Sequence, residues 1–343
     1  MHIMEGFSVD APGVIKGFGE HAVVYGRTAI AVAIDIYATA SVSAEGGQTM
    51  ELRLLDFEES ARFSLSELRH IYEEYRSRTS IEEYIKNSSR IDAHVLPYAV
   101  VAARLVNETG MERLPSVVEI HSEIPMQSGC ASSAACSTAF AVALAKFSGV
   151  RPDDHKMVDI AREGERIVHR SDGAGKVDVI ASYYGGYVST ADGGKRVPIE
   201  VRLNMVLVDT GPKKSTAETV GNVRRLYQQD REGTEKRLEE IERCAVEGLK
   251  ALASGDLVKG GECMYRDHEI LKELGVSSEG LDKAVGIAKK NGAYGAKLSG
   301  GGGGGIAVVL CRETGGMVKA MEEAGFKAYV AEVSLSGARD FLE

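Results

Sequence analysis

Residues 123–135 read EIPMQSGCASSAA, and this stretch predicts most about the architecture. Apolar and polar residues alternate before it over 116–124, as in a half-buried strand, and an alanine-rich helix is predicted from about Ser132 to Phe147. The first amides of a helix lack intrahelical partners, and the helix macrodipole makes that end positive. Small residues in the connecting loop leave room for phosphate oxygens, so the junction predicts an anion-binding cradle. A helix with an ordinary serine N-cap is the alternative.

Two other stretches are unusual for a plain core. Residues 300–305 are six consecutive glycines between two apolar strands. Such a run costs backbone entropy and therefore indicates that another segment or a ligand approaches closely; a flexible linker is the alternative. Near the N-terminus, Glu20 and His21 interrupt an apolar, glycine-rich segment, 11–26. Burying such a pair in a plain core would be costly, so we expect either a site or an exposed loop there.

The remaining pattern predicts an α+β protein. We expect a buried strand pair over 28–44, a polar helix over 63–88, a strand near 202–210 and a helix near 278–291. These elements do not alternate regularly as βαβ units, which argues against a doubly wound sheet. A boundary near 190–200 divides the chain into two predicted domains, residues 1–195 and 196–343.

Composition narrows the function classes. The chain has 343 residues and a formal net charge of −9. An acidic chain argues against nucleic-acid and anionic-membrane partners, since both favour a basic surface. The five cysteines form no CxxC pair, and no signal peptide or membrane span is evident. We expect a cytoplasmic protein with a small anionic substrate; a homodimer is left open.

Together the three stretches resemble the three motifs of the GHMP kinases, and GEHAVVYG (19–26) resembles the mevalonate kinase branch of that family. The resemblance implies a ribosomal-protein-S5-like N-terminal domain, a ferredoxin-like C-terminal domain and a site between them that uses ATP and Mg²⁺. It implies that Asp178 accepts the proton of the attacking hydroxyl, that Ser133 and Glu165 bind Mg²⁺, and that Glu20 and His21 contact the acceptor. The residues expected to hold the ATP phosphates are Ser128, Gly129, Cys130, Ala131, Ser132, Ser133, Gly300, Gly301 and Gly302.

The chain departs from the family pattern at several positions. Val14 stands where the family has a lysine that pairs with the catalytic aspartate. Residues i and i+2 of a strand point to the same face, so we expect Lys16 to reach the cleft and stabilise charge; a lysine pointing into solvent is the alternative. Gln127 and Ala131 replace family glycines, and Ala131 is a small change if its φ is negative.

These departures favour an altered substrate over an inactive enzyme. Lys213 and Lys214 follow a predicted strand, in a segment that borders the substrate in the family, and with Lys16 they would hold an extra phosphate. We therefore expect a kinase that phosphorylates the 5-hydroxyl of mevalonate or of mevalonate 3-phosphate. A decarboxylase on the same fold and a non-catalytic metabolite-binding protein are the alternatives, and solvated lysines are the alternative for Lys213 and Lys214.

Overall fold

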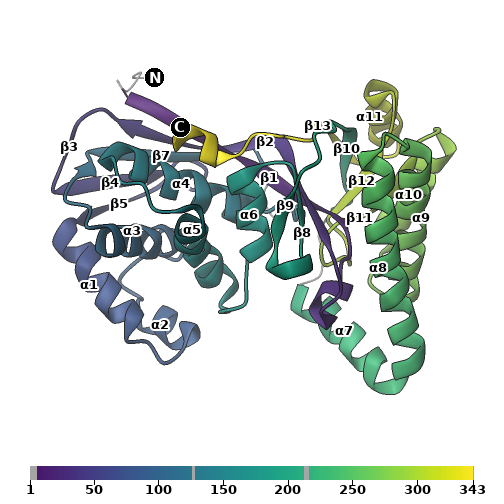
Figure 1. Cartoon of the computed structure of the whole chain (residues 1–343), viewed down its shortest axis with the longest axis horizontal. Helices are drawn as coiled ribbons and strands as arrows, with labels where there is room; N and C mark the ends of the chain where they lie inside the picture. The colour runs from purple at the N-terminus through teal and green to yellow at the C-terminus, as the bar shows by residue number, and fades with distance from the viewer. Residues whose placement is uncertain (1–5, 126–127, 212–215, 343) are drawn as a thin grey trace.

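The computed structural model describes residues 6–125, 128–211 and 216–342, and these contain two large sheets, with helices packed against each, and a two-stranded ribbon (Figure 1). This mixed arrangement confirms the predicted α+β class. Among the helices of the described residues, none combines the length and apolar character that crossing a membrane requires.

The first sheet has the strand order β5-β4-β7-β2-β8-β9. Strand β2 is long enough to pair with β7 and β8 at different residues, and β1 pairs with β2 along most of its length. All pairings of this sheet are antiparallel except that of β4 with β7. A short ribbon, β3 (Gly46–Gly47) with β6 (Leu114–Pro115), lies beside it. The strands of the sheet are β1 (Gly6–Phe18), β2 (Ile30–Ser43), β4 (Thr49–Leu54), β5 (Glu59–Ser64), β7 (Val117–Ser122), β8 (Tyr187–Ser189) and β9 (Lys195–Val197).

One helix of this part, α4 (Ser132–Ser148), is central. Its residues from Ala134 to Ala145 are all buried, as expected for a helix that is apolar on every side. It packs against β1, β2 and several helices, and this packing fixes the position of its N-terminus. The other helices are α1 (Leu65–Arg76), α2 (Ile81–Asn87), α3 (Leu96–Thr109), α5 (Asp154–His169) and α6 (Lys176–Tyr184), with the 3₁₀ turns η1 (Ala22–Tyr25) and η2 (Ala191–Gly193).

The second sheet has the order β11-β12-β10-β13 and is antiparallel throughout. Helices α8 and α9 pack against each other, and α9 and α10 pack against β11. Its strands are β10 (Asn204–Asp209), β11 (Gly295–Leu298), β12 (Ile306–Leu310) and β13 (Lys327–Glu332), and its helices are α7 (Thr216–Gln229), α8 (Arg231–Ala253), α9 (Leu257–Glu273), α10 (Glu279–Lys290) and α11 (Thr314–Glu323).

The end of the chain returns to the first sheet. The Ser334 amide donates to the Ala33 carbonyl oxygen (3.0 Å), and the 3₁₀ turn η3 (Ala338–Leu342) packs on α4, α6 and β1. The last residues therefore join the two parts of the molecule. The division expected between residues 195 and 196 falls inside β9 and stays a prediction.

Two element predictions were wrong in detail. The stretch 28–44 contains one long strand, β2, at residues 30–43, because no glycine or proline interrupts it; its partner is β1, at residues 6–18. The helix predicted over 63–88 is two helices, because Ser80 caps a second one by accepting a hydrogen bond from the Glu83 amide.

Candidate active site between the two sheets

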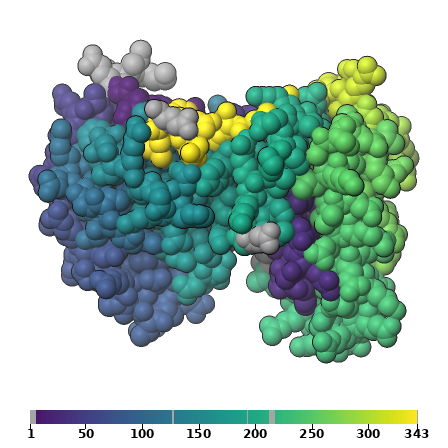
Figure 2. All heavy atoms as spheres, in the orientation of Figure 1, coloured from purple at the N-terminus to yellow at the C-terminus, as the bar shows by residue number. Residues whose placement is uncertain are grey.

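Figure 2 shows a hollow in the surface. The blue and teal part of the molecule lies on one side of it, and η1 (purple) and α7 (green) lie on the other. Asp178 lies in the first turn of α6, and Lys16 lies near the end of β1. The Lys16 ammonium group donates to Asp178 Oδ1, and the two side chains are 29% and 21% exposed. Lys16 therefore reaches the aspartate to which the family resemblance assigns the base, and the pair remains accessible to a small molecule. The catalytic roles of both residues stay predictions. Val14 is buried in the core instead.

The loop before α4 has the expected open helix start. No side chain caps α4 within the described residues, so its first amides are available to an anion. Ser128 supports the loop from inside, because its hydroxyl donates to the Pro125 carbonyl oxygen (2.6 Å) and its Oγ accepts from the Cys130 amide (3.3 Å). Ser132 instead bonds the hydroxyl of Ser122 (2.9 Å).

Ala131 corrects one expectation. Its φ is +54°, so the condition of a negative φ does not hold. A left-handed conformation costs a residue with a Cβ about 1–2 kcal/mol. Local strain of this kind persists where the surrounding structure requires it, most often at functional sites. The other substituted position, Gln127, lies outside the described residues.

The two loops expected to hold phosphate are attached to the same edge of β1. The Val14 amide donates to the Cys130 carbonyl oxygen (2.9 Å), and the Lys16 amide donates to Ser299 Oγ (2.9 Å). Amides at i and i+2 of a strand point to the same edge, so the phosphate loop and the start of the glycine run meet β1 side by side. That both loops contact ATP stays a prediction.

The glycine run does need glycines for close approach. A Cβ on Gly302 would lie 2.0 Å from the Val276 carbonyl oxygen, and the φ of Gly302 is +75°. Gly300 also has a positive φ, and the Gly301 carbonyl oxygen lies 2.9 Å from His21 Nε2. The linker alternative is therefore wrong for this segment.

Glu165 has the character of a metal ligand. It is buried on α5, and its Oε1 has no hydrogen-bond partner among the described residues, while Oε2 lies 3.3 Å from His169 Nε2. A buried carboxylate oxygen without a donor suits Mg²⁺, which commonly takes one or two carboxylates and completes its shell with phosphates and water. Ser133, at the start of α4, is partly exposed. No cluster of three or more His, Cys, Asp or Glu ligands occurs in the described residues, so the phosphates would have to supply much of the coordination.

Glu20 is engaged elsewhere. Its carboxylate accepts from Lys297, which also lies 3.5 Å from Asp267, and all three side chains are essentially fully buried. Burial and the neighbouring Glu20 charge raise the pKa of Asp267 to about 7, although Lys297 opposes the shift. In this structure Glu20 connects η1 to α9 and β11, and its contact with an acceptor stays a prediction.

His21 is also largely enclosed. Its φ is +62°, and burial lowers the pKa of its imidazole against the opposing effect of the Gly301 carbonyl. A neutral imidazole at neutral pH follows from this shift. The other two residues expected to face the acceptor, Lys213 and Lys214, lie outside the described residues.

Sequence comparison agrees with this geometry. Residues 97–186 match the GHMP kinases N terminal domain, and residues 249–316 match the GHMP kinases C terminal region. A protein of Pyrococcus abyssi named mevalonate kinase is 32% identical to this chain over 340 residues, which cover 96% of each sequence. The chain belongs to the GHMP kinase family.

The fold of this GHMP kinase also matches solved structures. Mevalonate kinase from Methanococcus jannaschii has a TM-score of 0.79 at 22% identity, covering 97% of this chain and 99% of that one. L. major mevalonate kinase in complex with R-mevalonate has a TM-score of 0.74 at 24% identity, covering 98% and 99%. The predicted GHMP kinase fold is therefore confirmed.

Sequence reasoning missed Lys297 and Asp267 of this GHMP kinase. A lone lysine in the apolar strand AKL, just before the glycine run, was the available signal. A lysine within an apolar strand is buried only when an acidic residue pairs with it. This rule would have prompted a search for the acidic partners of Lys297.

Proposed function

We propose that this GHMP kinase transfers the γ-phosphate of ATP to the 5-hydroxyl of a mevalonate-type acceptor. The observation that carries the proposal is the partly exposed ion pair between Lys16 and Asp178. Lys16 lies two residues after Val14, whose amide bonds the loop that precedes the uncapped start of α4. The relatives of this chain that are named mevalonate kinase support the choice of acceptor.

In the proposed reaction, Asp178 accepts the proton of the attacking hydroxyl and orients it. Lys16 holds Asp178 in place and offsets the charge that develops on the transferred group. The amides at the start of α4 bind the nucleotide phosphates. Ser133 and Glu165 would hold Mg²⁺, which neutralises phosphate charge when bound.

The proposal leaves two candidates for the acceptor, which differ in whether it already carries a phosphate. Mevalonate is the first candidate, and mevalonate 3-phosphate is the second because Lys213 and Lys214 follow β10 in the sequence. Two adjacent lysines would suit a second anionic group on the substrate. The cytoplasmic location expected from the sequence stays a prediction, and the homodimer stays open.

A coupled assay of ADP release tests the proposal against its alternatives. We expect turnover with mevalonate or mevalonate 3-phosphate and no turnover with mevalonate 5-phosphate, and phosphorus NMR should place the new phosphate on the 5-oxygen. Release of carbon dioxide would instead identify a decarboxylase. Binding of these compounds without ADP release would identify a non-catalytic paralogue.

A further inference from the structure

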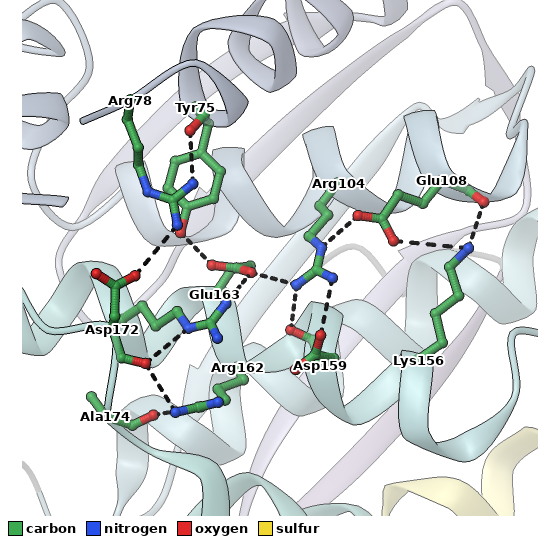
Figure 3. A network of polar contacts seen from close by, with 11 residues as sticks. Tyr75, Arg78, Arg104, Glu108, Lys156, Asp159, Arg162, Glu163, Asp172 and Ala174 are labelled. Atoms are coloured by element: carbon green, nitrogen blue, oxygen red, sulfur yellow. Dashed lines mark hydrogen bonds and ion pairs between the residues drawn. The ribbon is translucent and has the colours of Figure 1, made fainter. Parts of the chain in front are cut away.

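A network of polar side chains joins α1, α3 and α5 to the loop that follows α5 (Figure 3). Its centre is Glu163 on α5, whose side chain is only 2% exposed. Glu163 accepts hydrogen bonds from Tyr75 on α1, Arg104 on α3 and Arg166 on α5. A carboxylate satisfied by several donors in a low-dielectric setting is held rigidly, so Glu163 fixes three helices relative to one another.

Two arginines extend this network to the loop between α5 and α6. Arg162 donates through Nε to the Ala174 carbonyl oxygen (2.7 Å) and through a terminal nitrogen to the Asp172 carbonyl oxygen (3.0 Å), as Figure 3 shows. Arg166 donates through Nε to the same Asp172 carbonyl oxygen (3.2 Å). The guanidinium of Arg162 therefore bonds two main-chain carbonyls through two nitrogens whose relative position is fixed, whereas a lysine offers one nitrogen on a flexible stem.

Polar contacts hold this loop in place. Residues 170–173 are exposed, and Arg170 adopts a positive φ of +52°, so side-chain packing contributes little over this stretch. Besides the arginine contacts to its carbonyls, the Ser171 amide donates to the Arg166 carbonyl oxygen (3.0 Å), and Arg78 lies 3.5 Å from Asp172 Oδ1. The loop leads directly to Gly175, the N-cap of α6, whose carbonyl oxygen accepts from the Val179 amide (3.0 Å).

Gly175 connects this loop to both of the proposed functional carboxylates. A Cβ on Gly175 would lie 2.2 Å from Cβ of Glu165 and 3.1 Å from its Oε2, so the backbone of Gly175 packs directly on the proposed metal ligand. Asp178 follows in the first turn of the helix that Gly175 caps. Any displacement of the loop would therefore move Asp178 and Glu165 relative to each other.

We propose that Arg162 is a positioning residue for phosphoryl transfer: by clamping the carbonyls of Asp172 and Ala174, it sets the geometry of Asp178 against Glu165. The inference rests on the proposed function. Arg166 braces the same loop from the Glu163 side of the network. A shift of about 1 Å in a catalytic group can cost on the order of 100-fold in rate, so a clamp behind the site affects turnover without touching substrate.

The test compares Arg162→Ala with Asp172→Ala by steady-state kinetics and hydrogen–deuterium exchange. Asp172→Ala is the matched control, because it removes an exposed side chain, with its 3.5 Å contact to Arg78, and leaves the clamped carbonyl in place. For Arg162→Ala we expect kcat to fall about 10- to 100-fold with both KM values within about twofold, and faster exchange confined to the amides of residues 171–179. Asp172→Ala should resemble the wild type in all of these.

Wild-type kcat in Arg162→Ala would overturn the inference, and so would accelerated exchange spread evenly over the N-terminal sheet. If Arg162→Ala does not fold, Arg162→Lys replaces it, since a lysine keeps the charge and loses the fixed pair of donor nitrogens. An intermediate kcat is then expected, and wild-type kcat contradicts the clamp. The exchange measurement needs no turnover. It therefore separates failure of the clamp from failure of the proposed function, in which the wild type itself would lack kinase activity.

Discussion

Asp178→Asn is expected to lower kcat by about 10²- to 10⁴-fold, the usual contribution of a positioned general base. The asparagine keeps the shape of the side chain but is neutral. It cannot accept the proton of the attacking hydroxyl, and it cannot form the ion pair that Asp178 makes with Lys16. KM for ATP should change by less than about threefold, because the proposed phosphate contacts lie on α4 rather than α6. Steady-state kinetics with the acceptor identified in the ADP-release assay measures both parameters.

Asp159→Asn provides the matched control for this prediction. Asp159 is a half-exposed carboxylate on α5 that pairs with Arg104 at 3.1 Å, away from the Lys16 contact. The same chemical change there should leave kcat within about twofold, as is usual for surface substitutions. An Asp178→Asn variant that turns over at the wild-type rate would show that another group is the base.

Lys297→Met should destabilise the protein by about 3–5 kcal/mol, the cost of removing one partner from a buried ion pair. Lys297 is fully buried between the carboxylates of Glu20 and Asp267, and it also donates to the Leu298 carbonyl oxygen (2.7 Å). A methionine fills most of the volume and leaves two buried carboxylates without a counter-charge. Urea denaturation at about pH 7.5, above the raised pKa of Asp267, measures the change in free energy of unfolding.

Lys319→Met is the surface control for this prediction, because Lys319 is 78% exposed and lies 3.9 Å from Glu323. It should change the free energy of unfolding by less than about 0.5 kcal/mol. An equal change in the free energy of unfolding for the two substitutions would mean that the buried ion pairs of Lys297 do not stabilise the fold more than a surface contact does.

Asp267→Asn separates the charge of the cluster from its packing. The raised pKa of Asp267, to about 7 from an ordinary value of 3.8, means that the folded protein binds a proton that the unfolded chain has released. This group therefore lowers wild-type stability as pH rises from about 4 to about 7, and the loss is complete above that range. Denaturation across these pH values should show a smaller decline for Asp267→Asn than for the wild type.

Two features of the candidate site could be predicted from short stretches of sequence, whereas the roles of Asp178, Ser133 and Glu165 rest on the family resemblance and stay predictions. Lys16 could be predicted because strand periodicity allows a lysine two residues after Val14 to take over a contact, and the structure brings it to Asp178. The open helix start could be predicted because small residues directly before an apolar helix leave its first amides uncovered. Both inferences use residues within a few positions of one another.

Features that depend on distant segments could not be predicted in the same way. Glu20 and Lys297 are 277 positions apart, and nothing in either neighbourhood specifies that they meet. The φ of Ala131 is positive, although a residue with a Cβ ordinarily favours a negative φ, so the residue type alone gave no sign of this conformation. The arginine clamp on the α5–α6 loop binds main-chain carbonyls, which leave no signature in the sequence.

A crystal structure of the protein with Mg²⁺ and a non-hydrolysable ATP analogue would test the proposed kinase site most directly. We predict that the phosphates lie against the amides of residues 128–133 and that the metal contacts Glu165 and Ser133, with the γ-phosphate facing Asp178 and Lys16. A nucleotide bound away from the start of α4, with Asp178 facing no phosphate, would contradict the proposed site.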